Sequence, residues 1–119
     1  MSVKKLYQQS ESVSDHIFRI IQFWTPFTKQ IIGAPLQLSI DKACIYLINS
    51  LDSHQKTSYL EKAYQNITQT LVWLDKSRRR KLVNRRDYQH LYNDLNAIQD
   101  LISQHLAPKK SNSKNKSKS

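Results

Sequence analysis

Seven basic side chains fall within eleven consecutive residues and form the most distinctive chemical feature of this sequence. The segment 76–86 contains no acidic residue, and its cations are Lys76, Arg78, Arg79, Arg80, Lys81, Arg85 and Arg86. Lysine and arginine neutralise phosphates and release counterions. Arginine also offers a bidentate fork to phosphate and a flat face to unpaired bases. The segment therefore predicts a binding site for nucleic acid or for an acidic partner.

A second group of cations lies in residues 107–119, which contain five lysines and no acid. Lys109 and Lys110 are therefore predicted to contribute to nucleic-acid binding. The chain of 119 residues has a net charge of +10, but outside these two segments seven basic residues face nine acidic ones. The positive charge is thus concentrated in two places. Two other interpretations stay open: cations can stabilise a helix C-terminus, and a lysine tail can simply increase solubility.

Arg85 and His90 offer one enzymatic alternative. Their Arg-x4-His spacing resembles the pattern of HEPN-type helical ribonucleases, in which such a pair acts on RNA at a dimer interface. Histidine can move protons, and arginine can hold phosphate. An offset of five residues corresponds to ~140° around a regular helix, so the two side chains are not expected to share a face. The chain is predicted to have no catalytic residue and no enzymatic activity.

Other chemistries lack the residues that they need. Gly33 is the only glycine, which excludes phosphate-binding glycine loops. The four histidines lack metal-ligand spacing and close acidic partners, so neither a metal site nor a cofactor is predicted, and no small-molecule substrate is expected. The single cysteine, Cys44, is expected to be a small buried hydrophobic residue. The lack of a secretory signal and of a long apolar run predicts a cytoplasmic protein without membrane contact.

Apolar residues recur at steps of three and four in four blocks, which is the period of amphipathic helices. The first helix is expected from about Ser12 to Ile31, with Trp24, Phe27 and Ile31 on its buried stripe and a kink or a local end at Pro26. The second is expected to start after a turn at Gly33. The third runs from about residue 58 to the basic segment.

The fourth helix is expected to start at Asn84, with Asp87 in its first turn, and to end at Pro108. These elements predict an all-α fold, an up-down-up-down antiparallel four-helix bundle over residues 12–107. Residues 1–11 are interpreted as a polar N-terminal segment and residues 108–119 as a disordered tail of Lys, Ser and Asn. Connectivity places the basic segment at the same end as Gly33, and the tail at the opposite end.

Several apolar residues point away from the predicted core. Counting ~100° per residue, this set contains Phe18, Leu38, Ile45, Ile48, Val72 and Trp73. Several exposed apolar residues on neighbouring helices indicate a protein interface, so self-association is predicted. The alternative is that the helices rotate enough in the bundle to bury these residues.

The sequence also resembles a known family. Phe27, a basic residue, Ile32-Gly33, Leu36, Ile40, Ala43 and Leu47 follow the order of the first half of the small "four helix bundle protein" family. The later positions Leu60, Ala63, Leu71, Leu74, Asp87-Tyr88, Leu91, Leu95 and Ile98 are similar to its last two helices. The resemblance covers about residues 12–106. The family includes proteins encoded in ribosomal-RNA intervening sequences and the accessory variability determinant (Avd) proteins of diversity-generating retroelements.

Two positions bear on the branch of this family. The run Asn49-Ser50-Leu51-Asp52 stands where the ribosomal-insert branch has Asn-Ile-Ala-Glu-Gly, which favours the retroelement branch. Gln104 and His105 stand where the family often has a small residue and a tryptophan. The resemblance implies a homopentameric barrel that binds the retroelement's reverse transcriptase and RNA or cDNA, and so supports mutagenic reverse transcription. The alternative is a ribosomal-insert type of protein that binds RNA or an acidic protein.

Overall fold

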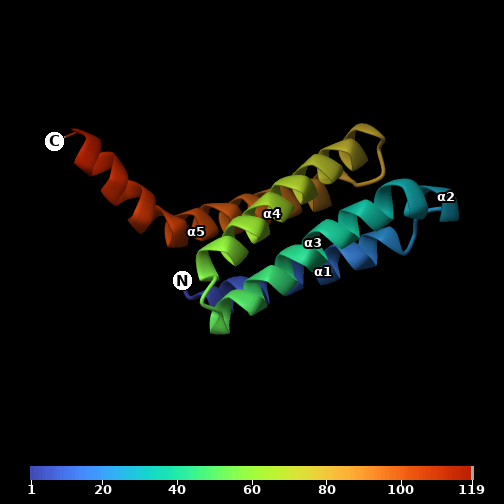
Figure 1. The fold of residues 1–119 in the computed structure, drawn as a ribbon. Helices are drawn as coiled ribbons and strands as arrows, with labels where there is room; N and C mark the ends of the chain where they lie inside the picture. Colours follow the sequence, from blue (N-terminus) through green and yellow to red (C-terminus); the bar gives the residue numbers. More distant parts are fainter. Residues whose placement is uncertain (119) are drawn as a thin grey trace.

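The computed structural model describes the backbone of residues 1–118 and the side chains of residues 1–106. All regular elements in this part of the chain are helical: α1 (Val3–Ile21), α2 (Pro26–Thr28), η1 (Lys29–Gly33), α3 (Ala34–Asn49), η2 (Ser50–Asp52), α4 (Lys56–Arg79) and α5 (Arg85–Lys118). Helix α3 packs between α1 and α4, and α5 packs against α4 and α1 (Figure 1). The predicted all-α architecture with four long helices is confirmed.

One hydrophobic core runs along the axis of the four helices. Each long helix contributes side chains at three- and four-residue spacing, which lie on one face of a helix. The largest of those under 2 % exposed are Leu6, Ile17, Ile32, Leu36, Ile40, Leu47, Leu60, Ile67, Leu74, Leu91, Leu95 and Ile98. A buried hydrogen bond of 2.8 Å, donated by Thr70 Oγ1 to Ser39 Oγ, joins α4 to α3 within this core.

Helix α1 begins earlier than the sequence pattern predicted. Ser2 caps it by accepting a hydrogen bond from the Lys5 amide at 3.2 Å, and Val3, Leu6 and Ser10 are buried. The interpretation of residues 1–11 as a polar segment outside the bundle, with the helix starting near Ser12, is therefore wrong. Ser10 hid the helical period, because a polar residue stands at a buried position of the helix. Its hydroxyl is satisfied there by donating to the Leu6 carbonyl at 2.9 Å.

The chain reverses at residues 22–25 and not at Gly33. Thr25 caps the next helix by accepting a hydrogen bond from the Thr28 amide, and Pro26 occupies its first turn, where no N–H is needed. This helix then continues without a break to Asp52. Gly33 lies inside it, where an added Cβ would approach Ile21 Cγ2 to 3.0 Å. Glycine thus permits a close helix approach here instead of making a turn.

The early reversal changes which residues of this region are buried. Phe27 and Ile31, predicted for the buried stripe of the first helix, lie after the turn and are 68 % and 41 % exposed. Trp24 lies within the turn, is half-buried and packs against the core. Of the two expectations for Pro26, a kink within one helix is wrong. The first helix ends shortly before this proline, at Ile21, and Pro26 starts the next helix.

Helix Pro26–Asp52 is long and apolar enough to cross a membrane by length and composition alone. In the structure its residues Leu36, Ile40, Ala43 and Leu47 are buried in the core, and the helix packs against both α1 and α4. This helix is therefore the central helix of the fold. Burial explains this apolar face, whereas other apolar residues of the helix, among them Leu38 and Ile45, are exposed.

Helix α5 extends further than predicted. Its backbone is helical through Pro108 to Lys118, past the rest of the bundle (Figure 1), where the sequence predicted a helix end and a disordered tail. Lys109 and Lys110 lie outside the residues whose side chains the structure describes, so their role in binding stays a prediction. At this end His105 Nε2 lies 2.8 Å from the Met1 carbonyl oxygen, which places α5 beside the N-terminus as expected.

Candidate nucleic-acid interface

The loop between α4 and α5 begins with a tight closure of α4. The amides of Lys81 and Leu82 donate to the carbonyls of Arg78 at 3.0 Å and Ser77 at 2.9 Å, and Lys81 has a φ of 60°. This is the hydrogen-bond pattern of a Schellman motif, in which the left-handed residue is usually glycine. Here a lysine occupies it. The closure turns the chain away from α4 and leaves Arg80 and Lys81 exposed at the end of the bundle.

Contacts with the rest of the bundle hold this loop in place. The Trp24 indole Nε1 donates a hydrogen bond of 3.1 Å to the Leu82 carbonyl, and Val83 is buried in the core. The bond joins the 22–25 reversal to the basic loop, so both lie at one end of the molecule (Figure 1). The predicted placement of the basic segment beside the first chain reversal is confirmed, although that reversal is not at Gly33.

Asn84 starts α5, as predicted. Its Oδ1 accepts a hydrogen bond from the Asp87 amide at 2.7 Å, and its Nδ2 donates to Asp87 Oδ2 at 3.0 Å. Arg85 and Arg86 are therefore the first two residues of the helix, and both are exposed. Cations at a helix N-terminus oppose the helix dipole. Stabilisation of a helix end, which is one explanation for the cations that end α4, does not account for these two arginines.

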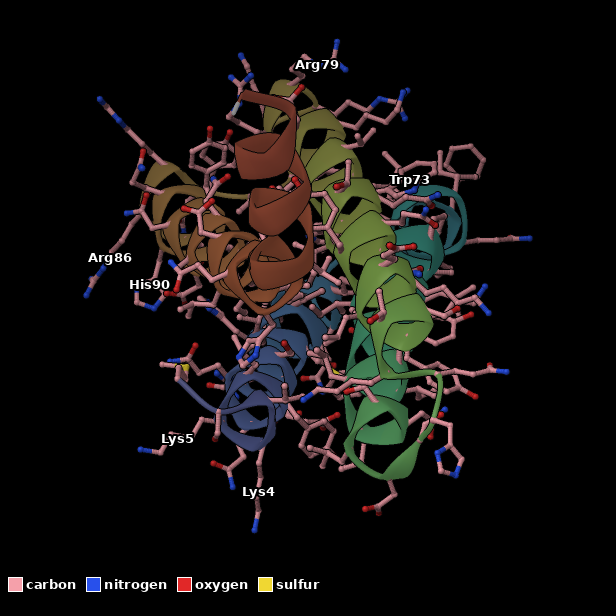
Figure 2. All side chains as sticks on the ribbon, turned by 60° about the vertical axis from the view of Figure 1, so that its left-hand side comes forward. Lys4, Lys5, Trp73, Arg79, Arg86 and His90 are labelled. Atoms are coloured by element: carbon pink, nitrogen blue, oxygen red, sulfur yellow. The ribbon has the colours of Figure 1, made fainter. Side chains whose placement is uncertain are left out.

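Asp75 neutralises part of the basic segment. Its carboxylate oxygens lie 2.8 Å from Arg78 Nη2 and 3.1 Å from Arg79 Nε. The hydrogen bond from Arg78 lowers the pKa of Asp75 below its ordinary value. This acid stands one position upstream of residues 76–86, so the charge of that segment by itself does not reveal the pairing. Arg78 and Arg79 are thus paired at the exposed end of α4, and Figure 2 shows Arg79 pointing away from the helix.

Four exposed cations of the segment form no ion pair with the described side chains. These are Arg80, Lys81, Arg85 and Arg86, all exposed. Arg86 projects outward beside His90 (Figure 2). Lys76 also forms no ion pair, but this residue is half-buried and its ammonium lies 5.8 Å from the centroid of the Trp73 ring. The uncompensated positive charge therefore lies on the loop and on the first turn of α5.

Two open clefts flank the first turns of α5. One, of about 930 Å³, lies between α1 and α5 and is lined by His16, Asn84, Arg85, Arg86, Asp87, Gln89, His90 and Asn93. The other, of about 750 Å³, is lined by Arg78, Lys81, Leu82, Val83, Asn84, Arg85, Tyr88 and Gln89. Arg85 lines both. Cations from the end of α4, the loop and α5 are thus gathered around two neighbouring hollows.

The first cleft contains a histidine that the sequence pattern did not single out. His16 comes from α1, its Nε2 lies 3.3 Å from Asp87 Oδ1, and its ring centroid lies 5.7 Å from that of His90. His90 Nε2 in turn lies 3.4 Å from Asp94 Oδ2. The prediction that the histidines lack acidic partners is therefore wrong. For His90 the four-residue spacing to Asp94 was a usable signal, whereas the approach of His16 is a tertiary contact.

Arg85 and His90 border the same cleft. Both line the cleft between α1 and α5, although ~140° separates their positions around the helix. Arg85 is the first residue of α5 and has a long side chain, and the cleft is wide, so the two positions do not need to share a narrow face. Lining one wide cleft is not a contact between the two side chains, so their expected position on different faces of the helix stays a prediction.

Other candidate groups show no arrangement for chemistry. Among the described side chains, no group of three or more His, Cys, Asp or Glu residues is placed to hold a metal ion. Cys44 is buried, as expected, and burial together with the nearby Glu11 carboxylate raises the pKa of its thiol. A neutral, enclosed thiol is a poor nucleophile and a poor metal ligand.

The apolar residues selected as a possible interface are mostly exposed. Phe18, Leu38, Ile45, Ile48 and Val72 are between 41 % and 54 % exposed, which excludes their burial by helix rotation, whereas Trp73 is half-buried and packs against the core. Ile31 extends this set, because it precedes Leu38 by seven residues on the same continuous helix, as Leu38 precedes Ile45. Self-association itself stays a prediction.

Comparison with known proteins adds nothing to this geometry. No family model matches the sequence, and no curated protein and no solved structure matches it.

Proposed function

We propose that this protein is a basic accessory protein that binds nucleic acid at the α4–α5 end of its bundle and catalyses no reaction itself. The observation that carries the proposal is the group of four exposed cations, Arg80, Lys81, Arg85 and Arg86, without ion pairs to the described side chains. Binding a polyphosphate to these cations releases counterions, which provides affinity with little sequence preference.

The position of these cations supports a binding role over a structural one. Arg85 and Arg86 stand where the helix dipole disfavours positive charge, so they add no stability to α5. Lys81 occupies a left-handed backbone position where glycine would cost less. Binding of a partner explains why positive charges stand at these structurally unfavourable positions.

The proposed partners come from the resemblance to Avd proteins. They are a reverse transcriptase encoded by a diversity-generating retroelement and its RNA or cDNA, in the cytoplasm, with the protein supporting mutagenic reverse transcription. The exposed apolar residues of α3 and α4 support self-association, with five subunits by resemblance. Binding of RNA or an acidic protein, as in the ribosomal-insert branch, is the alternative. Co-purification with a neighbouring reverse transcriptase and the native mass test these partners.

The nucleic-acid site is tested by salt-dependent binding. Wild-type protein is titrated against a fluorescent single-stranded RNA at several salt concentrations, and the slope of log affinity against log salt is expected to fall by ~0.7 for each phosphate that a variant no longer binds. Replacing Arg80, Lys81, Arg85 and Arg86 together by alanine is expected to reduce the slope by up to about 3 on that basis. The matched control replaces Lys4, Lys5, Lys42 and Lys56, four exposed lysines elsewhere.

The control makes the result specific to the site. Both variants lose the same charge, so a general electrostatic attraction would weaken binding equally in the two. The proposal predicts a strong reduction only for the loop variant, with the helical circular-dichroism spectrum unchanged. Equal slopes for the two variants would refute this placement of the site.

A HEPN-type ribonuclease is the second candidate, and one observation favours it. Arg85, His90 and His16 line the same cleft. There, one imidazole would take the proton from an RNA 2′-hydroxyl as this oxygen bonds to the adjacent phosphorus. The other would protonate the departing 5′-oxygen as its bond to phosphorus breaks, leaving a cyclic phosphate and a 5′-hydroxyl.

The ribonuclease candidate predicts cleavage that depends on the cleft histidines. Clean preparations are incubated with RNA and with the same strand carrying 2′-deoxy sugars, which lack the attacking oxygen. Cleavage of RNA alone, abolished in His90→Ala and in His16→Ala, would support it. Absence of cleavage by the wild-type protein would remove this candidate and leave the binding proposal unaffected.

A further inference from the structure

Two tyrosines on successive turns of α5 stack on each other next to the basic loop. The ring centroids of Tyr88 and Tyr92 lie 5.7 Å apart, with an angle of 23° between the planes. The Arg78 guanidinium reaches from α4 to lie 5.3 Å from the centroid of the Tyr88 ring. These three residues form a column of flat groups that joins α4 to α5, which we call the stacking column.

The column is held at one end and open at the other. Arg78 is fixed by its 2.8 Å ion pair with Asp75, and Tyr88 is half-buried and packs against the core. Tyr92 is 42 % exposed and does not belong to the core. An exposed aromatic ring supported from behind by a second ring is a preorganised surface for another flat group.

Cations adjoin the column at Tyr88. The cleft of about 750 Å³ that includes Tyr88 is also lined by Lys81 and Arg85, neither of which has an ion-pair partner among the described side chains. A strand that places its phosphates on these cations therefore carries its bases past the column. Proteins that bind single strands combine these two features, a cationic track and aromatic rings.

We propose that the stacking column binds an unpaired nucleobase, so that the site takes single-stranded nucleic acid in preference to a duplex. The inference rests on the proposed function and specifies its ligand. In a duplex each base is already stacked between its neighbours and paired, and so its face is not available to Tyr92. In a single strand the base can leave its neighbours and lie on the ring, with the adjacent phosphates near Lys81 and Arg85.

The alternative explanation is that the tyrosines only stabilise the helix pair. Tyr88 has such a role, because it packs on the core and holds Arg78. Tyr92 is the residue that separates the two explanations, since substituting it leaves the Arg78–Tyr88 contact in place. Tyr64 provides a matched control: it is 37 % exposed on α4 and lines a different hollow with Glu61 and Gln65.

The test compares three fluorescent probes of equal length: a uridine-rich single strand, the same strand with abasic sites, and a duplex. The abasic strand has the same phosphates but no base to stack. Wild-type protein is expected to bind the complete strand about 10-fold more tightly than the abasic strand, the order expected for removal of a stacked base. The duplex is expected to bind more weakly than the complete strand at equal salt.

Substitutions assign this difference to the column. Tyr92→Leu is expected to lower affinity for the complete strand to that for the abasic strand, with the salt slope unchanged because every cation that binds phosphate is still present. Tyr92→Trp is expected to retain the preference, and Tyr64→Leu to leave all three affinities unchanged. Circular dichroism checks that each variant is folded, and Tyr92→Trp provides a second folded variant if Tyr92→Leu unfolds.

The outcomes separate this inference from the proposed function. If Tyr92→Leu discriminates the three probes as the wild type does, the stacking site is refuted, while salt-dependent binding through the cations still stands. The same holds if the wild type binds duplex and abasic strands as tightly as the complete strand. If the wild type binds none of the probes at low salt, both the stacking site and the proposed function are refuted.

Discussion

Replacing Lys81 by glycine separates the backbone geometry of the α4–α5 loop from its charge. Lys81 has a φ of 60°, in the region that favours glycine, and it closes α4 through the amides of Lys81 and Leu82. A left-handed conformation costs an L-residue ~1–2 kcal/mol, which glycine does not incur. Glycine also lowers the free energy of unfolding by ~0.5–1 kcal/mol, because it has more conformational entropy in the unfolded chain.

The expected net effect of Lys81→Gly is a gain in the free energy of unfolding of about 0.75 kcal/mol, the middle of a range of ~0–1.5 kcal/mol. For a chain of this size the gain corresponds to a rise in Tm of about 2–5 °C. The same substitution removes one cation from the proposed site, and the slope of log affinity against log salt should fall by ~0.7 if that cation contacts a phosphate. The variant is therefore expected to be more stable and to bind less.

Lys81→Ala is the matched control, because it removes the same charge and keeps a Cβ in the left-handed position. It should weaken binding equally without the gain in Tm. Thermal unfolding followed by circular dichroism and salt titration of RNA binding measure the two effects. A Tm for Lys81→Gly at or below that of Lys81→Ala would refute the left-handed closure. Unchanged binding by both variants would remove Lys81 from the interface.

Three further substitutions test how the site is built. Gly33→Leu is expected to destabilise the fold by ~1–3 kcal/mol in chemical denaturation, because a Cβ there already meets Ile21 at 3.0 Å; wild-type stability would contradict this close approach. Trp24→Phe is expected to cost about 1 kcal/mol in the same assay, since it leaves the Leu82 carbonyl without its donor. Asp75→Asn should strengthen RNA binding at low salt by freeing two arginines, and an unchanged affinity would argue against their contact with RNA. The pKa of this carboxyl is lowered in the folded protein, so its small contribution to stability is present at neutral pH and is lost only as the pH falls below the ordinary carboxyl range.

The fold class and the position of the positive charge along the chain follow from the amino-acid sequence alone. Four blocks with helical period predicted an all-α fold, because the spacing of apolar residues decides which face of a helix can be buried. Exposure of Leu38, Ile45 and Val72 followed from the same count. Asn84 was identified as the start of α5 because its side chain can satisfy a free amide of the first turn.

Tertiary packing decided the helix boundaries at positions where the local sequence is compatible with more than one structure. Pro26 can end one helix or stand in the first turn of the next, and Gly33 can form a turn or lie inside a helix. Only packing against α1 places the reversal at residues 22–25. Ser10 was similarly ambiguous, since a serine can be buried in a helix once its hydroxyl bonds to the preceding turn.

The details of the site depended on the tertiary structure. The sequence showed seven cations in one segment, but not that Asp75 pairs with two of them and that four of the other five are exposed without an ion pair to the described side chains. It also did not show that His16 from α1 joins His90 in one cleft, or that Arg78 from α4 lies on a tyrosine of α5. Helical periodicity describes one helix at a time. Contacts between residues far apart in the chain depend on how the helices are rotated and offset against each other, which the packing of the whole core decides.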